Sequence, residues 1–160
     1  MNEMLIELGK RAKAAENSLR TISTDKKNQV LSAVADHLVE CADALLAANA
    51  KDVENGKANH MPEGLIDRLL LTKERIQGMA EGLCQLVGLE DPIGEVTGMK
   101  KRPNGLLTGQ KRVPLGVIGI IYEARPNVTA DAFGLCFKTG NVVILKGGSD
   151  AIHSNKAIVD

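Results

Sequence analysis

A lysine, two glycines and a serine follow an apolar run late in the chain: Lys146, Gly147, Gly148 and Ser149 come directly after residues 142–145. Ligands bind at the carboxyl ends of parallel strands, and glycines let a ligand approach the backbone closely. Lys146 offers a charge there, and the N-terminus of a following helix attracts anions. The segment is neither a P-loop nor a G-x-G-x-x-G fingerprint, so a plain strand-to-helix turn capped by Ser149 is an equally good interpretation.

A second polar segment, residues 122–127, follows the apolar run 117–121. Arg125 can form a bidentate pair with a carboxylate or a phosphate. Glu123 could orient that arginine, and Asn127 is a good N-cap for a helix that follows. The alternative is a structural salt bridge between Glu123 and Arg125 at a domain seam, and the bare sequence slightly favours this alternative.

The cysteines and histidines predict no reactive centre. The cysteines fall within helical patterns beside apolar neighbours and are expected to be buried thiols, with no nearby cation to stabilise a thiolate: Cys41, Cys84 and Cys136. They form neither a disulfide framework nor a zinc-ligand set. The histidines are scattered, so no metal site is expected: His37, His60 and His153.

Charge and hydropathy limit the classes of protein to consider. Twenty basic residues balance twenty acidic ones, which gives no reason to expect a nucleic-acid or anionic-membrane partner. No apolar run approaches the length of a membrane span. With 44% hydrophobic and 25% charged residues, the composition is that of a soluble globular protein, and the cytoplasm is the expected compartment.

Residues 1–90 are expected to form the helical part of a cofactor-binding domain. Met4, Leu5 and Leu8 recur at helical spacing, as do apolar residues from Val30 into a long amphipathic helix that ends near Ala48. Further helices are expected to start at residues with N-terminal preferences, of which Ser23, Thr24, Pro62 and Thr72 are the clearest.

Residues 91–114 are expected to form a β-hairpin, because Asn104-Gly105 separates two extended stretches, 95–102 and 106–113. Residues 115–160 then have an α/β pattern. Strands are expected at 117–121 and 142–145, with a helix from Val128 to Lys138 between them. Two parallel strands cannot close a core by themselves, so the sequence predicts an incomplete parallel-sheet nucleotide-binding domain that is truncated at Asp160.

Two long motifs resemble the γ-glutamyl phosphate reductase family of the aldehyde dehydrogenase superfamily. They are VPLGVIGIIYEARPNVT at residues 113–129 and TGNVVILKGGSDAIHSN at residues 139–155. Shorter matches bring the resemblance to essentially all 160 residues: Ser23-Thr24, Asn49–Asp52, Arg68-Leu69 and the turn Arg102–Leu106. The resemblance implies an aldehyde-dehydrogenase-like α/β fold whose β-hairpin serves in oligomerisation.

The resemblance also implies an activity, the NADPH-dependent reduction of L-glutamate 5-phosphate to L-glutamate 5-semialdehyde and phosphate in proline biosynthesis. A cysteine thiolate would attack the acyl phosphate, and hydride from NADPH would reduce the thioester. Lys146 matches the lysine that contacts the adenosine ribose, and residues 147–149 match the adjoining cofactor loop. Residues 122–126 match a Pro-Trp-Asn-x-Pro segment whose Asn holds the oxyanion; Ala124 replaces it here, which leaves Arg125 or Asn127 as candidates for substrate contact.

The resemblance implies that the nucleophilic cysteine lies beyond Asp160, so this N-terminal portion is expected to be inactive alone. The implied partners are L-glutamate 5-phosphate, a second copy of the chain bound through the 95–113 hairpin, and glutamate 5-kinase. The alternative is a truncated, non-catalytic paralogue that acts as an interaction module or a weak nucleotide-binding module.

Overall fold

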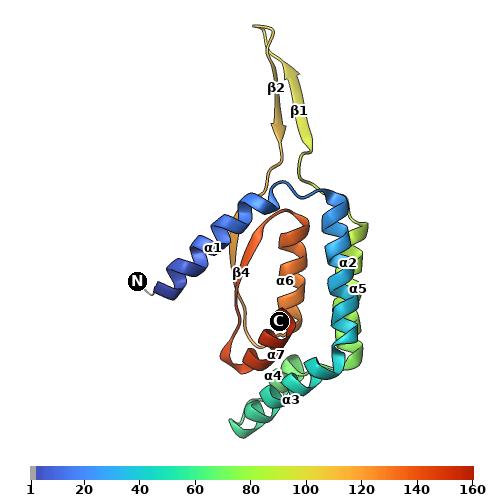
Figure 1. Ribbon diagram of the computed structural model, residues 1–160, viewed down its shortest axis with the longest axis vertical. Helices are drawn as coiled ribbons and strands as arrows, with labels where there is room; N and C mark the ends of the chain where they lie inside the picture. The colour runs from blue at the N-terminus through green and yellow to red at the C-terminus, as the bar shows by residue number, and fades with distance from the viewer. Residues whose placement is uncertain (1–2) are drawn as a thin grey trace.

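The computed structural model describes residues 3–160. A helical N-terminal region precedes a hairpin and an open two-stranded parallel sheet, as the sequence predicted (Figure 1). The elements are α1 (Glu3–Leu19), α2 (Thr24–Glu40), α3 (Ala42–Ala58), α4 (Glu63–Leu69), α5 (Lys73–Gly88), β1 (Val96–Lys101), β2 (Leu107–Lys111), β3 (Val117–Ile121), α6 (Asn127–Lys138), β4 (Val142–Lys146), the short 3-10 helix η1 (Ser149–Ala151) and α7 (Ile152–Val159). Within residues 3–160, no helix has the length and apolar character needed to cross a bilayer.

The expected helix starts at Ser23 and Thr72 are confirmed by their capping bonds. The Ser23 hydroxyl accepts the N–H of Lys26, and the Thr72 hydroxyl accepts the N–H of Arg75. The single long helix expected to run to Ala48 is wrong. The backbone leaves the helical conformation at Cys41, and α3 departs in a new direction toward α7 while α2 stays beside α5 (Figure 1). No glycine or proline marks this bend in the sequence.

The main core lies where α2, α5 and α6 meet. Leu31, Ile76 and Leu83 are almost fully buried there. Gly134 on α6 lets the helices approach closely, since a Cβ at this position would lie 2.8 Å from Leu86 Cδ1.

The apolar face expected near the start of α1 is present in the helix but is not covered. Met4, Leu5 and Leu8 are exposed, and the buried residues of α1 are Ala12 and Glu16, farther along the helix. Only the later part of α1 contributes to packing, because α1 meets the sheet at β3 and β4. Helical spacing thus predicted the element correctly, and the packing of its first turns incorrectly.

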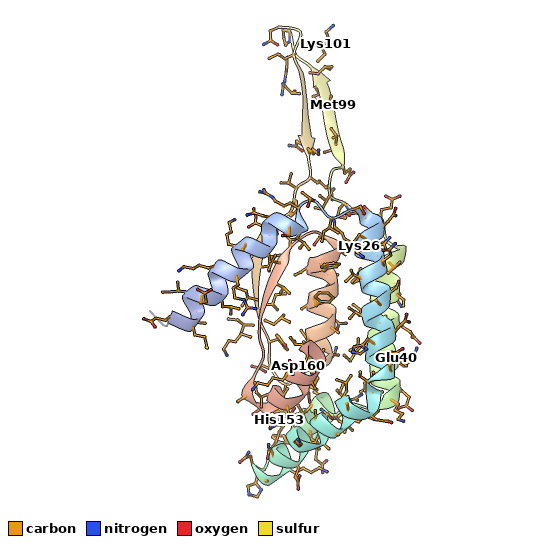
Figure 2. All side chains as sticks on the ribbon, viewed as in Figure 1. Lys26, Glu40, Met99, Lys101, His153 and Asp160 are labelled. Carbon is orange, nitrogen blue, oxygen red and sulfur yellow. The ribbon has the colours of Figure 1, made fainter. Side chains whose placement is uncertain are left out.

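The hairpin β1–β2 projects away from the rest of the molecule, and Met99 and Lys101 lie along it far from the helices (Figure 2). Its turn has the expected chemistry: Gly105 has a φ of 84°, and the Asn104 side chain accepts the N–H of Leu106. The paired strands, Val96–Lys101 and Leu107–Lys111, are shorter than the expected stretches. Almost every hairpin residue is exposed, as expected.

A buried ion pair joins α2 to the segment before the hairpin. Lys27 Nζ lies 2.8 Å from Asp91 Oδ2, and the two side chains are 4% and 8% exposed. Burial alone would raise the pKa of Asp91. Hydrogen bonds from Lys27, the Ile93 N–H and the Thr24 hydroxyl outweigh this effect and hold the pKa below its ordinary value of 3.8.

This ion pair gives a pH prediction. A lowered pKa in the folded state stabilises the fold above the ordinary carboxyl pKa, and that stability is lost as the pH falls through the folded value. Urea unfolding should show Asp91→Asn clearly less stable than the wild type near neutral pH, with the difference shrinking at acid pH. A difference that stays constant over this range would contradict the assignment. Asp36→Asn, an exposed change on α2, is the control.

Candidate functional site

The two polar segments singled out in the sequence meet at the carboxyl ends of β3 and β4. These strands are parallel, with Ile121 paired to Lys146, and the Tyr122 N–H donates to the Lys146 carbonyl at 3.1 Å. Beyond the strands, a Cβ on Gly148 would lie 3.5 Å from Glu123 Cα. The segments 122–127 and 146–149 therefore form one continuous surface at the strand ends.

Gly147 is required by close packing rather than by an unusual backbone angle. A Cβ at this position would overlap the side-chain amide of Asn155 and would lie 3.3 Å from Tyr122 Cζ. Asn155 is held in place from α6, because the Thr129 hydroxyl donates to Asn155 Oδ1 at 3.0 Å and lies 2.6 Å from the Tyr122 hydroxyl. Within residues 3–160, Asn155 Nδ2 is buried without a hydrogen-bond partner.

The loop has features that suit a bound dinucleotide. Lys146 is exposed at the end of β4, and its ammonium has no hydrogen-bond or ion-pair partner among residues 3–160. Gly147 and Gly148 follow it and are partly exposed, with Asn155 filling the space that a side chain at Gly147 would take. The alternative interpretation of this loop placed Ser149 as a helix cap, but Gly148 is the cap residue of η1 and Ser149 makes no capping bond.

The N-terminus of α7 does not offer the anion site that the sequence suggested. Asp52 on α3 accepts the N–H of His153 at 3.1 Å and that of Ser154 at 2.7 Å, and its Oδ2 also accepts the Ser154 hydroxyl at 2.6 Å. His153 lies at this junction with the lower helices (Figure 2). The chain's own carboxylate thus occupies the position that an anionic ligand would take.

A buried asparagine extends this junction. Asn49 Nδ2 donates to the Leu69 carbonyl at 2.8 Å and to the Ser154 hydroxyl oxygen at 2.9 Å, and its Oδ1 accepts the N–H of Leu71 at 2.7 Å. Asn49 and Asp52 are each 1% exposed. Together they tie α3 to the end of α4 and to α7, and so fix the helix that follows the 146–149 loop.

A pocket of about 410 Å³ opens beside the start of α6. It brings Arg125 and Asn127 together with Arg68, a residue that the family resemblance alone had marked. Three further charged residues on its wall were missed in the sequence analysis: Asp67, Arg75 and Asp131. Their signal was weak, since each is a single charge within an amphipathic helical pattern.

The pocket contains both paired and unpaired charges. Arg75 pairs with Asp67 Oδ1 at 2.8 Å and donates to the backbone carbonyls of Asp67 and Leu70. The Asn127 amide donates to Asp131 Oδ2 at 3.1 Å, and burial nevertheless raises the pKa of the Asp131 carboxyl.

Two expectations about segment 122–127, on Glu123 and on Asn127, need correction. Glu123 does not pair with Arg125 through its side chain: their contact is the Arg125 N–H donating to the Glu123 carbonyl at 2.8 Å. Asn127 is the first helical residue and Pro126 is the cap, since Pro126 already has helical angles. Ala124 is buried against Leu69 and Ala151, so its side chain faces away from any ligand.

Only one cysteine matches the expected buried thiol. Cys136 is buried, and this burial raises the pKa of its thiol. Cys84 is exposed, because it lies on the outer side of α5, and Cys41 is partly exposed at the bend, where its sulfur lies 3.5 Å from His37 Nε2. Residues 3–160 contain no cluster of metal-ligating side chains.

Comparisons with known proteins show what this chain is similar to. No family model matches the chain. It is 61% identical over 158 residues to the γ-glutamyl phosphate reductase of Lachnospira eligens, with 99% of this chain and 38% of that protein covered. The Halothermothrix orenii enzyme of the same name is 56% identical over 158 residues, again with 99% and 38% covered. The chain thus spans about two fifths of the curated relatives it matches.

Solved structures give the same result. The crystal structure of γ-glutamyl phosphate reductase from Thermotoga maritima superposes with a TM-score of 0.93 at 44% identity, covering 97% of this chain and 37% of that one. The Saccharomyces cerevisiae enzyme gives 0.90 at 33% identity, with 95% and 39% covered. A Bacillus subtilis putative aldehyde dehydrogenase, 17% identical with a TM-score of 0.73, covers 98% of this chain and 32% of its own and supports the fold alone.

Proposed function

We propose that this chain, which aligns with γ-glutamyl phosphate reductases over nearly its whole length, is the N-terminal portion of such an enzyme and supplies the first part of its cofactor-binding domain. The complete protein would reduce L-glutamate 5-phosphate to L-glutamate 5-semialdehyde with NADPH in the cytoplasm. The observation that carries the proposal is the likeness to the Thermotoga maritima enzyme over 97% of this chain.

The geometry at the strand ends supports distinct roles for this chain's residues. Lys146 would donate to the adenosine ribose of the cofactor, and the partly exposed backbone at Gly147 and Gly148 would contact the ligand. When bound, the cofactor supplies the hydride. Arg125 and Asn127 would bind the substrate in the adjacent pocket. Glu123 would contribute through its backbone, at the boundary between the two sites.

The hairpin suits contact with a second copy of the chain. β1 and β2 form an isolated two-stranded sheet, so each strand has one edge without a strand partner in residues 3–160. Such edges pair readily with another strand. We therefore propose a homo-oligomer formed through residues 95–113. A kinase that makes acyl phosphates, such as glutamate 5-kinase, would supply the labile substrate.

The isolated 160-residue chain should not oxidise NADPH in the presence of L-glutamate 5-phosphate. Its buried Cys136 has a raised pKa, and neither Cys41 nor Cys84 adjoins a lysine or arginine that would stabilise a thiolate. Absorbance of NADPH followed over time measures this directly. Turnover that disappears on replacing any of these cysteines with serine would show that the nucleophile lies within this chain.

The proposed function is tested on the native protein, captured from the source cells with an antibody to this segment. We expect a species well above twice the 17.1 kDa of this chain, with NADPH-dependent reductase activity. An inactive species of 17.1 kDa would contradict the proposal and favour a non-catalytic interaction module.

A further inference from the structure

The pocket beside α6 presents an unusual combination of charges. The guanidinium groups of Arg68 and Arg125 have no ion-pair or hydrogen-bond partner within residues 3–160, whereas Arg75 is held by Asp67. Asp131 is half-buried on the same wall, and its carboxylate accepts only a neutral amide, that of Asn127. Two cations and one anion therefore face the cavity without an opposite charge.

This combination discriminates between ligand classes. A simple phosphate or monocarboxylate would satisfy the two arginines but would leave Asp131 desolvated next to added negative charge. An α-amino acid carries a carboxylate and an ammonium on one carbon. Its carboxylate can form bidentate hydrogen bonds with guanidinium groups, and its ammonium can donate to Asp131.

The orientation of such a ligand follows from the position of the pocket. Arg125 lies in the segment that follows β3, near the strand ends where the 146–149 loop begins. Arg68 lies on α4 and lines the same pocket as Arg125. A ligand held by its amino-acid end in the pocket would direct its other end toward the strand ends, where the chemistry of the proposed reaction belongs.

We infer that the pocket binds the α-carboxylate and α-ammonium of the substrate, with Arg68 and Arg125 on the carboxylate and Asp131 on the ammonium. This inference rests on the proposed function for the identity of the substrate, and it adds the residues that select an α-amino acid. The site would distinguish the amino-acid substrate from plain acyl phosphates and aldehydes of the same length.

Calorimetric titration with L-glutamate tests the inference without any reductase activity. The wild-type chain should bind L-glutamate at least about tenfold more tightly than glutarate, which lacks the ammonium, or 4-aminobutyrate, which lacks the α-carboxylate. Arg68→Gln and Arg125→Gln should each weaken L-glutamate binding by about tenfold or more. Asp131→Asn should remove the preference for L-glutamate over glutarate. Arg11→Gln, an exposed change on α1, should leave binding unchanged.

Equal binding of L-glutamate and glutarate by the wild type would overturn the inference, as would L-glutamate binding that is absent or is unaffected by the three pocket variants. The wild-type comparison needs no variant, so a folding defect cannot obscure it. A native protein that has the expected mass and activity but shows no amino-acid preference would support the proposed function and contradict the inference about the pocket. Selective amino-acid binding by a native protein that has no reductase activity would support the inference about the pocket and contradict the proposed function.

Discussion

Asp52→Ala is expected to lower the free energy of unfolding by about 3 kcal/mol, the loss typical of removing a buried, fully hydrogen-bonded carboxylate. Alanine would leave the N–H groups of His153 and Ser154 and the Ser154 hydroxyl without their acceptor. It would also remove the negative charge from the N-terminus of α7, where the helix dipole favours it. Because Asn49 bonds the same Ser154 hydroxyl, the loss should extend to the α4 contact.

Chemical denaturation of the wild type and of Asp52→Ala measures this loss, with Glu54→Ala as the matched control. Glu54 is also an acidic residue of α3, but it is exposed, so its replacement should change the stability by no more than about 0.5 kcal/mol. The loss of stability in Asp52→Asn should fall between those of Asp52→Ala and Glu54→Ala, since an amide oxygen can still accept from one N–H. Equal effects of Asp52→Ala and Glu54→Ala would show that the carboxylate does not anchor α7.

Hydrogen exchange locates the effect. In Asp52→Ala the amides of α7 should lose protection more than those of α2 and α5, because the lost hydrogen bonds join α3 to α7. The 146–149 loop precedes α7 directly, so loosening the helix would also loosen the proposed cofactor contact at Lys146. Uniform loss of protection throughout the chain would instead indicate a single cooperative unit.

Local signals in the sequence predicted most elements of the fold. Ser23 and Thr72 marked helix starts because their hydroxyls satisfy N–H groups within the same turn. Asn104-Gly105 marked the hairpin because Gly105 adopts a positive φ. The bend at Cys41 was missed because no residue type enforces it: apolar spacing continues through it, and packing of α3 against α7 determines the new direction.

The site was predicted only in part, because its other members depend on partners distant in sequence. The strand ends identified Lys146 and Arg125 by topology alone. Asp52 gave no such signal, since its partners His153 and Ser154 lie 101 and 102 residues away. Its place on the α3 face that also buries Leu45 was the available clue, because a carboxylate on an apolar face must have a partner.

Gly147→Ala is expected to destabilise the fold by about 2 kcal/mol, within the range for an added methyl group in a filled space. The new Cβ would displace the Asn155 amide, and with it the bond from the Thr129 hydroxyl that also contacts Tyr122. Gly148→Ala is the matched control. Gly148 has a φ of −65°, and its Cβ would meet Glu123 Cα at an ordinary 3.5 Å, so little change is expected.

A double-mutant cycle separates this collision from a backbone effect. Asn155→Ala alone should cost about 1 kcal/mol through the lost hydrogen bond. Adding Gly147→Ala to it should cost much less than it does in the wild type, because the amide that would overlap the methyl group is gone and only the contact with Tyr122 Cζ at 3.3 Å remains. Additive costs in thermal and chemical unfolding would contradict this account and would mean that Gly147 is needed for its backbone. A strong coupling would identify Asn155 as the residue that requires glycine at the centre of the loop.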